Sequence, residues 1–261
     1  MLYFIFQALE LGKYQKCKAR HTQKLRRIFR GRQAKKERII LIMELQTVLE
    51  KRQSIRRYKE GDIPEADIRE IIKAAGIAPS GKNIQNWHFI AIKNRDLIEK
   101  IKLTVDKKNE EISNEMMKVD EEKGLRFRKF CKNFTLFFAN APVLTVVYGT
   151  VYTPSGYNEY KLIDAPDEIL DDLLGHRNPG MQSVGAALEN FTLKAIDMGY
   201  GSCWLTSANY AAKEIEDLLA KEIGFTKEGF FMVAMMAMGI PEDNQKSPAK
   251  KSLDEIYTFV E

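Results

Sequence analysis

The stretch that decides the fold is QSVGAALENFTLKAIDMGYGSCW, residues 182–204. From residue 184 to residue 198 it has helical character, and its apolar side chains fall on more than one face of that helix. A helix that is apolar nearly all round is buried, so we predict a central helix here. Gly199-Tyr200-Gly201 then breaks the helix, and a short strand is expected over 202–206.

The rest of the chain contributes helices and strands in an irregular order. Apolar spacing predicts helices near residue 45, from Pro64 onward, over 97–105 and over 212–220, and a charged helical segment over 106–132 that could cap a site. Strands are expected over 87–92, 143–148 and 231–238, with a loop up to Pro179 and a turn over 239–243. The order has no regular β-α-β repeat, no GxGxxG and no P-loop, so an α+β fold around one sheet is predicted.

The charge of the chain is concentrated at its start. Residues 1–42 hold twelve Lys or Arg against Glu10 and Glu37, a surplus of ten. Because the whole chain has a net charge of +5, the remaining residues carry about five net negative charges by subtraction. A basic body would suggest nucleic acid, but a basic terminal block does not, and we predict no nucleic-acid partner. No apolar run is long enough for a membrane span, so no membrane association is expected.

Residues 1–42 are predicted to be separate from the domain formed by residues 43–261. Three interpretations stay open: a basic arm for acidic partners, an organelle-targeting peptide, or upstream sequence preceding a true start at Met43. The segment begins apolar and turns basic, the reverse of a secretory signal. Met43 stands directly before the first regular helical pattern, which favours the third interpretation.

Cysteine and histidine are too sparse to build a metal site or a nucleophile–base pair. Three cysteines lie far apart without a CxxC pair, and only three histidines are present. This pattern indicates a reducing compartment, so a cytoplasmic location is predicted, with no metal. Cys203 sits in a short apolar strand, which favours a packing role over a redox role.

The segment RQSIRRY, residues 52–58, offers two guanidinium groups at a spacing of four with a hydroxyl between them. Arginine forks suit phosphate because they present parallel donors to its oxygens. Taken alone, the segment is interpreted rather as a solvated basic surface.

A second segment, APSGKNIQNWHF, residues 78–89, combines small residues with amides. Small residues allow the backbone to approach a ligand closely, while Asn83 and Gln85 can both donate and accept hydrogen bonds. The mixed edge of an isoalloxazine ring requires such groups. Taken alone, the segment is interpreted rather as a polar turn leading into a strand, with Trp87 as a core residue.

Together, in this order, the two segments resemble the start of the nitroreductase family, which reads R-x-S-x-R and then P-S-x-x-N-x-Q-P-W. Residues 182–204 look like that family's central helix followed by its G-x-G-S-C-W segment. AMGIP at 237–241 looks like its late strand, and KKSLDEI at 250–256 looks like its basic tail. The resemblance spans about residues 44–260.

The resemblance implies a three-layer α/β/α sandwich around a mainly antiparallel sheet, in a domain-intertwined homodimer with FMN at the subunit interface. It also implies a set of residues that bind FMN. Arg52, Ser54 and Arg56 would hold the phosphate and ribityl groups, with Gln53 acting through its backbone. The partner subunit would supply Pro79, Ser80, Gly81, Asn83 and Gln85, while Cys203, Trp204 and Leu205 would pass near the ring and Lys251 would be the terminal basic residue.

Two positions depart from the family pattern. Asn86 stands where Pro usually precedes the Trp, and Lys251 replaces Arg, which exchanges a bidentate fork for a point charge. Lower FMN affinity is therefore expected.

The implied activity is hydride transfer from NADH or NADPH through flavin to a small electrophile such as a nitroaromatic, quinone or activated alkene. Because the flavin N5 carries the hydride, no catalytic side chain is assigned. Alternatives are dehalogenation, flavin fragmentation or peptide dehydrogenation on the same fold, or a flavin-binding protein without turnover.

Overall fold

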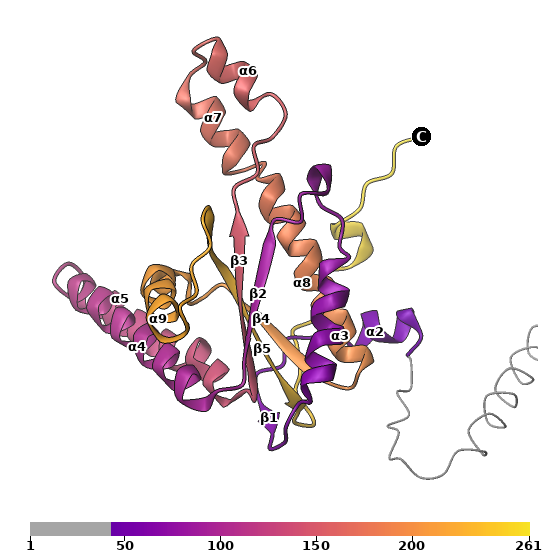
Figure 1. Ribbon diagram of the computed structural model, residues 1–261, viewed down its shortest axis with the longest axis vertical. Helices are drawn as coiled ribbons and strands as arrows, with labels where there is room; N and C mark the ends of the chain where they lie inside the picture. The colour runs from indigo at the N-terminus through magenta and orange to yellow at the C-terminus, as the bar shows by residue number, and fades with distance from the viewer. Residues whose placement is uncertain (1–42) are drawn as a thin grey trace, which may run out of the picture. The chain divides into compact units, whose positions relative to one another are not determined.

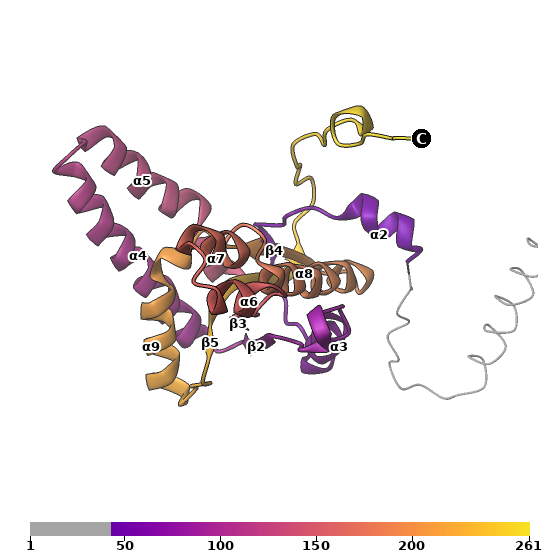
Figure 2. The same ribbon diagram turned by 90° about the horizontal axis from the view of Figure 1, so that it is seen from above.

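The computed structural model describes residues 43–261, which belong to one compact unit. The predictions for residues 1–42 lie outside the described residues. In the described part, helices lie on both faces of a five-stranded sheet, as Figures 1 and 2 show. The predicted α+β class with an α/β/α layering is therefore confirmed.

The strands of the sheet are all paired antiparallel. The long strand β5 (Phe230–Pro241) pairs with β3 (Val143–Thr150), with β4 (Gly201–Leu205) and with β1 (Tyr58–Lys59). On the other side of β3 lies β2 (Trp87–Ile92), which forms an edge of the sheet. The predicted turn after residue 238 is wrong in part, because β5 continues to Pro241 in order to pair with β1.

Each face of the sheet carries its own hydrophobic core, and strand alternation divides the residues between them. Along β3, Leu144, Val146 and Tyr148 face one core while Val143 and Val147 face the other. The first core is covered by α4 (Arg95–Met117), α5 (Glu121–Phe134) and α9 (Ala212–Ile223). The second is covered by α3 (Glu65–Gly76) and α8 (Pro179–Asp197).

Helix α8 confirms the predicted central helix. Asn178 caps it by accepting a hydrogen bond from the Met181 backbone N–H at 3.1 Å, and Pro179 occupies the first turn, where a missing N–H is tolerated. Leu188 and Phe191 are fully buried. Truncation of Phe191 to alanine should lower the free energy of unfolding by about 3–5 kcal/mol, the usual cost for a buried aromatic side chain.

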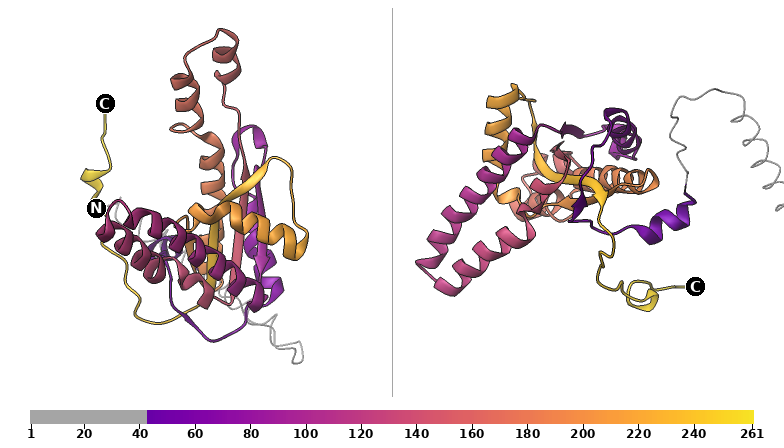
Figure 3. Two further views of the ribbon diagram at one scale, coloured as in Figure 1. Left: turned by 90° about the vertical axis from the view of Figure 1, so that its left-hand side faces the viewer. Right: turned by 90° about the horizontal axis from the view of Figure 1, so that it is seen from below.

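The charged segment over 106–132 is helical, as predicted. It supplies the second half of α4 and most of α5, which lie against each other as a hairpin that projects from the body (Figure 3). The predicted loop before Pro179 contains two short helices, α6 (Tyr157–Leu162) and α7 (Asp167–Leu174). The Pro and Gly residues that suggested a loop stand instead at the helix starts, with Gly156 and Pro166 as caps.

Candidate functional site

The first half of the site is an extended segment that follows α2 (Leu45–Lys51) and packs against β4. The Ile55 backbone N–H donates to the Ser202 carbonyl at 2.9 Å. Gly201 permits this approach, because a Cβ on that residue would lie 2.6 Å from Cγ1 of Ile55. In an extended segment alternate residues point to opposite sides, so Arg52, Ser54 and Arg56 share one side.

All three side chains lie near enough to Cys203 to affect the pKa of its thiol. Burial raises the pKa of the Cys203 thiol, and the positive charge of Arg56, a hydrogen bond with Ser54 and the charge of Arg52 oppose that rise. Cys203 itself is 3% exposed, which agrees with the predicted packing role. The arrangement gathers two guanidinium groups and a hydroxyl at one place, the donor set that a phosphate group requires.

Hydrogen bonds from Gln245, which the sequence did not predict, hold this segment in place. Gln245 Oε1 accepts from the backbone N–H groups of Arg56 at 3.1 Å and Arg57 at 3.0 Å, and Gln245 Nε2 donates to the Arg57 carbonyl. Tyr58 Oη donates to the Ile55 carbonyl at 2.7 Å, and burial holds the pKa of Tyr58 well above its usual value. No local pattern signals the Gln245 contacts, because Gln245 lies 189 positions from Arg56 and 188 from Arg57.

The second half of the site is the turn between α3 and β2, which includes the short 3-10 helix η1 (Gly81–Asn83). Lys82, Asn83 and Gln85 all have positive φ angles, near +50°, a conformation that residues other than glycine rarely adopt. Ser80 Oγ accepts from the Gln85 backbone N–H at 2.9 Å and closes the turn. Strain of this kind persists only where the surroundings enforce it, and it is often found at functional sites.

The turn is anchored to the start of α8. Ser183 Oγ accepts from the Gly81 backbone N–H at 3.3 Å. The Tyr152 ring packs so closely on Gly81 that a Cβ on this residue would lie 3.0 Å from the ring atom Cζ. Asn86, which replaces the usual proline, is 2% exposed and donates through Nδ2 to the carbonyls of Thr150 and Gly180. This departure therefore supports the turn rather than contacting a ligand.

The two halves lie toward opposite ends of α8. The turn at residues 80–85 meets the helix near Ser183, while α2 and the arginine segment lie by its end, where the Met43 N–H donates to Asp197 and Ile55 meets β4. The rise of a helix places Ser183 and Asp197 about 21 Å apart along the axis. One subunit thus separates the predicted phosphate residues from Pro79, Ser80, Asn83 and Gln85. Figure 1 shows the turn before β2 near the start of α8 and α2 near its end.

The remaining predicted residues divide between core and surface. Leu205 is buried like Cys203, whereas Trp204 between them is 42% exposed and lies over Gly185 of α8. The Gln53 side chain points away from the arginines and lines a cleft of about 310 Å³. Lys251 is exposed in the tail, four residues beyond Ser247, whose Oγ donates to Gln53 Oε1 at 3.4 Å.

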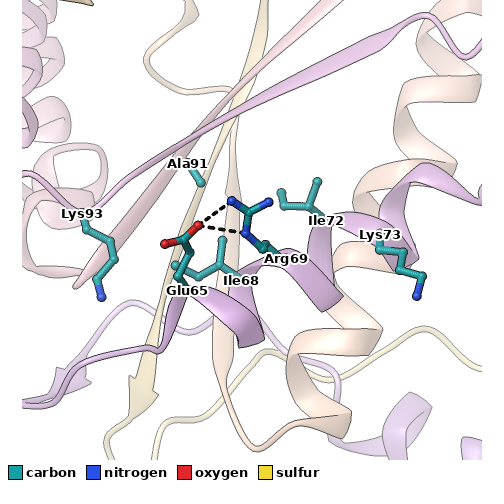
Figure 4. A pocket seen from close by; sticks show the side chains of 7 residues that line it. All are labelled: Glu65, Ile68, Arg69, Ile72, Lys73, Ala91 and Lys93. Carbon is teal, nitrogen blue, oxygen red and sulfur yellow. Dashed lines mark hydrogen bonds and ion pairs between the residues drawn. The ribbon is translucent and has the colours of Figure 1, made fainter.

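A larger groove of about 630 Å³ runs along the edge of the sheet between α3 and β2 (Figure 4). Ile68, Ile72 and Ala91 give it an apolar floor. Its other lining residues are Arg69, Lys73, Lys93 and Glu65, and Arg69 pairs with Glu65 across the helix turn at 2.6 Å. In the part of the chain that the structure describes, β2 pairs with β3 alone, so one side of its backbone has no strand partner.

Among residues 43–261, no helix is long and apolar enough to cross a membrane.

Comparison with known proteins agrees with this architecture. The model of the Nitroreductase family matches residues 49–240. A BluB-like flavoprotein from Clostridium difficile 630 is 61% identical, covers 84% of this chain and all of its own, and superposes with a TM-score of 0.81. A putative NADH dehydrogenase/NAD(P)H nitroreductase from Archaeoglobus fulgidus is 26% identical over 194 residues, 74% of this chain and 83% of that protein.

Iodotyrosine deiodinase 1 from Mus musculus is 31% identical over 110 residues, 42% of this chain but only 38% of the deiodinase. The family match covers most of the chain, so the protein belongs to the nitroreductase family and is an oxidoreductase. The predicted resemblance is thereby confirmed, while the assignment of individual binding residues stays a prediction.

Proposed function

We propose that the protein is an FMN-dependent oxidoreductase that uses NADH or NADPH to reduce a small electrophile. The observation that carries the proposal is the convergence of Arg52, Ser54 and Arg56 beside β4. The family uses FMN with a nicotinamide, and the solved structure that is 61% identical is described as a flavoprotein. Nitroaromatics, quinones and activated alkenes are the candidate electrophiles.

The residues present fit an FMN phosphate. Two guanidinium groups and a hydroxyl supply several charge-assisted hydrogen bonds, each contributing about 1.5–3 kcal/mol. The strained turn exposes Asn83 and Gln85, whose amides match the mixed edge of the flavin ring. Backbone groups of Cys203, Trp204 and Leu205 would lie along the ring, and Lys251 would reach the phosphate once the tail is bound.

The two halves of this site come together in a homodimer. Since one chain holds them toward opposite ends of α8, a second copy supplies Pro79, Ser80, Gly81, Asn83 and Gln85 to the flavin held by the first. The tail of the chain supports the intertwined form of this dimer, because Ile256, Phe259 and Val260 are all more than 60% exposed.

We place the tail of the second copy in the groove beside β2. Residues 253–261 combine β-branched and aromatic residues with Asp254, Glu255 and Glu261, whereas the groove has an apolar floor and a mainly basic rim. An extended segment can pair with the free backbone of an edge strand. The tail would therefore add a strand to the neighbouring sheet.

When bound, FMN supplies the redox chemistry by accepting a hydride from the nicotinamide and passing electrons to the electrophile in a ping-pong cycle. The chain's own residues bind and orient. Arg52, Ser54 and Arg56 fix the phosphate end, while backbone N–H groups of β4 and of the turn stabilise negative charge on the ring. Tyr152 at the root of the α6–α7 hairpin, and Tyr157 and Tyr160 within it, would shape the substrate pocket.

Free, buried Cys131 and Cys203 are consistent with the cytoplasmic location that we propose.

An anaerobic visible spectrum of the purified protein, before and after addition of NADH or NADPH, tests the proposal. Flavin bands that bleach are the expected result. Protein that stays colourless after addition of FMN would contradict the cofactor assignment. Flavin bands that do not bleach would instead indicate a flavin-binding protein without turnover.

Reductive dehalogenation is a second candidate, favoured by the similarity to iodotyrosine deiodinase 1. The test is iodide release from iodotyrosine by the reduced protein, compared with turnover of a nitroaromatic. Iodide release without nitroaromatic turnover would favour dehalogenation.

A further inference from the structure

Helix α5 has its polarity reversed relative to an ordinary surface helix. Its outward side carries Leu125, Phe130 and Phe134, which are 49%, 48% and 56% exposed. Phe130 and Phe134 stack on each other with ring centroids 5.4 Å apart. A helix normally turns its apolar side chains toward the core, so this side indicates a surface that is covered in the working protein.

The inward side of α5 carries the buried Gly124 and Cys131 together with the half-buried Phe127, whose ring centroid lies 5.5 Å from that of Tyr210. Gly124 lies so close to α4 that a Cβ would come 2.4 Å from Cγ of Met117. Asn109 of α4 is fully buried and donates through Nδ2 to the Phe127 carbonyl at 3.5 Å, and Cys131 Sγ lies 2.9 Å from Tyr210 Oη. The three large apolar residues on the outside therefore have no room in the α4–α5 contact.

The outward side of α5 is also basic. The whole helix has five Lys or Arg against two Glu, a surplus of three. Arg126 and Lys129 are exposed on the outward side, where Arg126 also pairs with Glu122 of the preceding turn. We call this surface, made of Leu125, Arg126, Lys129, Phe130 and Phe134, the α5 outer face. Its partner should be apolar and acidic.

The same chain carries such a surface on the α6–α7 hairpin. Residues 157–174 contain six Asp or Glu against Lys161, a surplus of five negative charges. Leu162 and Ile163 between the two helices are 84% and 70% exposed, and Glu168 and Asp171 are exposed on α7. In Figures 1 and 3 this hairpin stands above β3, whereas α5 projects from the side of the molecule, so the two surfaces belong to different places on one subunit.

We propose that the α6–α7 hairpin of a second copy packs on the α5 outer face, with Leu162 and Ile163 against the phenylalanines and Glu168 and Asp171 near Arg126 and Lys129. The contact rests on the dimer of the proposed function and adds to it a defined partner surface. In a two-fold dimer it is made twice. It places the hairpin of one subunit beside the other subunit's Arg56, which lies 5.8 Å from the Phe137 ring just after α5.

Charge reversal separates this contact from other dimer contacts. One variant, R126E/K129E, makes the α5 outer face acidic, and another, E168K/D171K, makes the hairpin basic. Each homodimer then sets like charges against each other at both contacts, so self-association weakens. In a mixed dimer one contact joins the two reversed surfaces and the other joins the two native surfaces, so both are complementary.

The two variants, differently tagged and each loaded with FMN, are mixed, and the dimers are counted by native mass spectrometry. Heterodimers in more than about nine-tenths of the dimers are expected, against one half for random pairing. The chain that carries all four changes should regain wild-type association. K213E/K221E, an equal charge change on α9, is the matched control and should pair at random with wild type.

Random pairing of the two reversed variants, or weakened homodimers that the mixture does not restore, would overturn the proposal. A wild type that stays monomeric at all concentrations would overturn it as well. A second measurement does not depend on charge. F130A/F134A should weaken the dimer at least tenfold, whereas V119A should not, because Val119 lies in the connection between α4 and α5, outside the α5 outer face, and is 91% exposed. Flavin binding and bleaching by NADH or NADPH are recorded for every variant, so failure of the contact is distinguishable from failure of the proposed function.

Discussion

Replacement of Gly201 by alanine tests how the fold builds the site. The new Cβ would lie 2.6 Å from Cγ1 of Ile55 and 2.9 Å from its Cβ and Cγ2. Real Cβ atoms do not approach so closely, so the segment from Arg52 to Arg56 has to move away from β4. That movement lengthens the 2.9 Å hydrogen bond from the Ile55 N–H to the Ser202 carbonyl.

Two effects are expected, one on thermal stability and one on FMN affinity. Overpacking of a tight contact costs about 1–3 kcal/mol. For a domain of this size a loss of 1 kcal/mol lowers the melting temperature by about 2–4 °C, so a decrease of about 2–12 °C is expected. Displacement of Arg52 and Arg56 should also weaken FMN binding by at least about tenfold, since one lost hydrogen bond to a charged group is worth about 1.5–3 kcal/mol.

Circular dichroism melting of the apoprotein and a fluorescence titration with FMN measure the two effects. Gly76→Ala is the matched control, because that glycine ends α3 and a Cβ there meets nothing within 4 Å. The control should be stabilised by about 0.5–1 kcal/mol. Ile55→Ala should rescue Gly201→Ala in part, since it removes Cγ1 and Cγ2 but leaves Cβ. A Gly201→Ala protein with unchanged melting temperature and FMN affinity would refute the reasoning.

Three further changes probe other contacts. Arg56→Ala should raise the Kd for FMN about 10–150-fold, while Arg57→Ala, whose side chain pairs with Glu242 instead, should change it little; equal effects in a titration would argue against the phosphate assignment. Asn86→Ala leaves the Thr150 and Gly180 carbonyls without their donor and should cost about 1–3 kcal/mol in urea unfolding, whereas an unchanged midpoint would mean that water replaces the amide. Burial and the charge of Lys227 lower the pKa of His88 below its usual 6.5, so the unfolded chain binds the proton more readily; stability is fully present above about pH 6.5 and falls as pH drops toward the folded pKa. His88→Gln should reduce this acid sensitivity in melting curves, and an identical pH profile would contradict it.

Local patterns were enough for most elements of the fold. The strand over 87–92 is found as predicted because its residues divide between the two faces of the sheet, and the helix around Leu188 and Phe191 is buried because it is apolar on more than one side. The helices at α6 and α7 were missed because Gly and Pro, the usual signs of a loop, also serve at helix starts. The end of β5 was missed because its last residues are strand only through pairing with β1.

The sequence by itself determined the kinds of groups available for binding: the arginines at 52 and 56, the amides at 83 and 85, and the family to which their order belongs. Only the tertiary structure decided where these groups lie. Arg56 is positioned by Gln245 and Gly81 by Ser183, contacts between residues more than a hundred positions apart that no periodicity encodes. It also decided that the two halves of the site lie toward opposite ends of α8. The turn packs against the start of this helix and α2 packs against its end, so the length of the helix keeps the two halves apart.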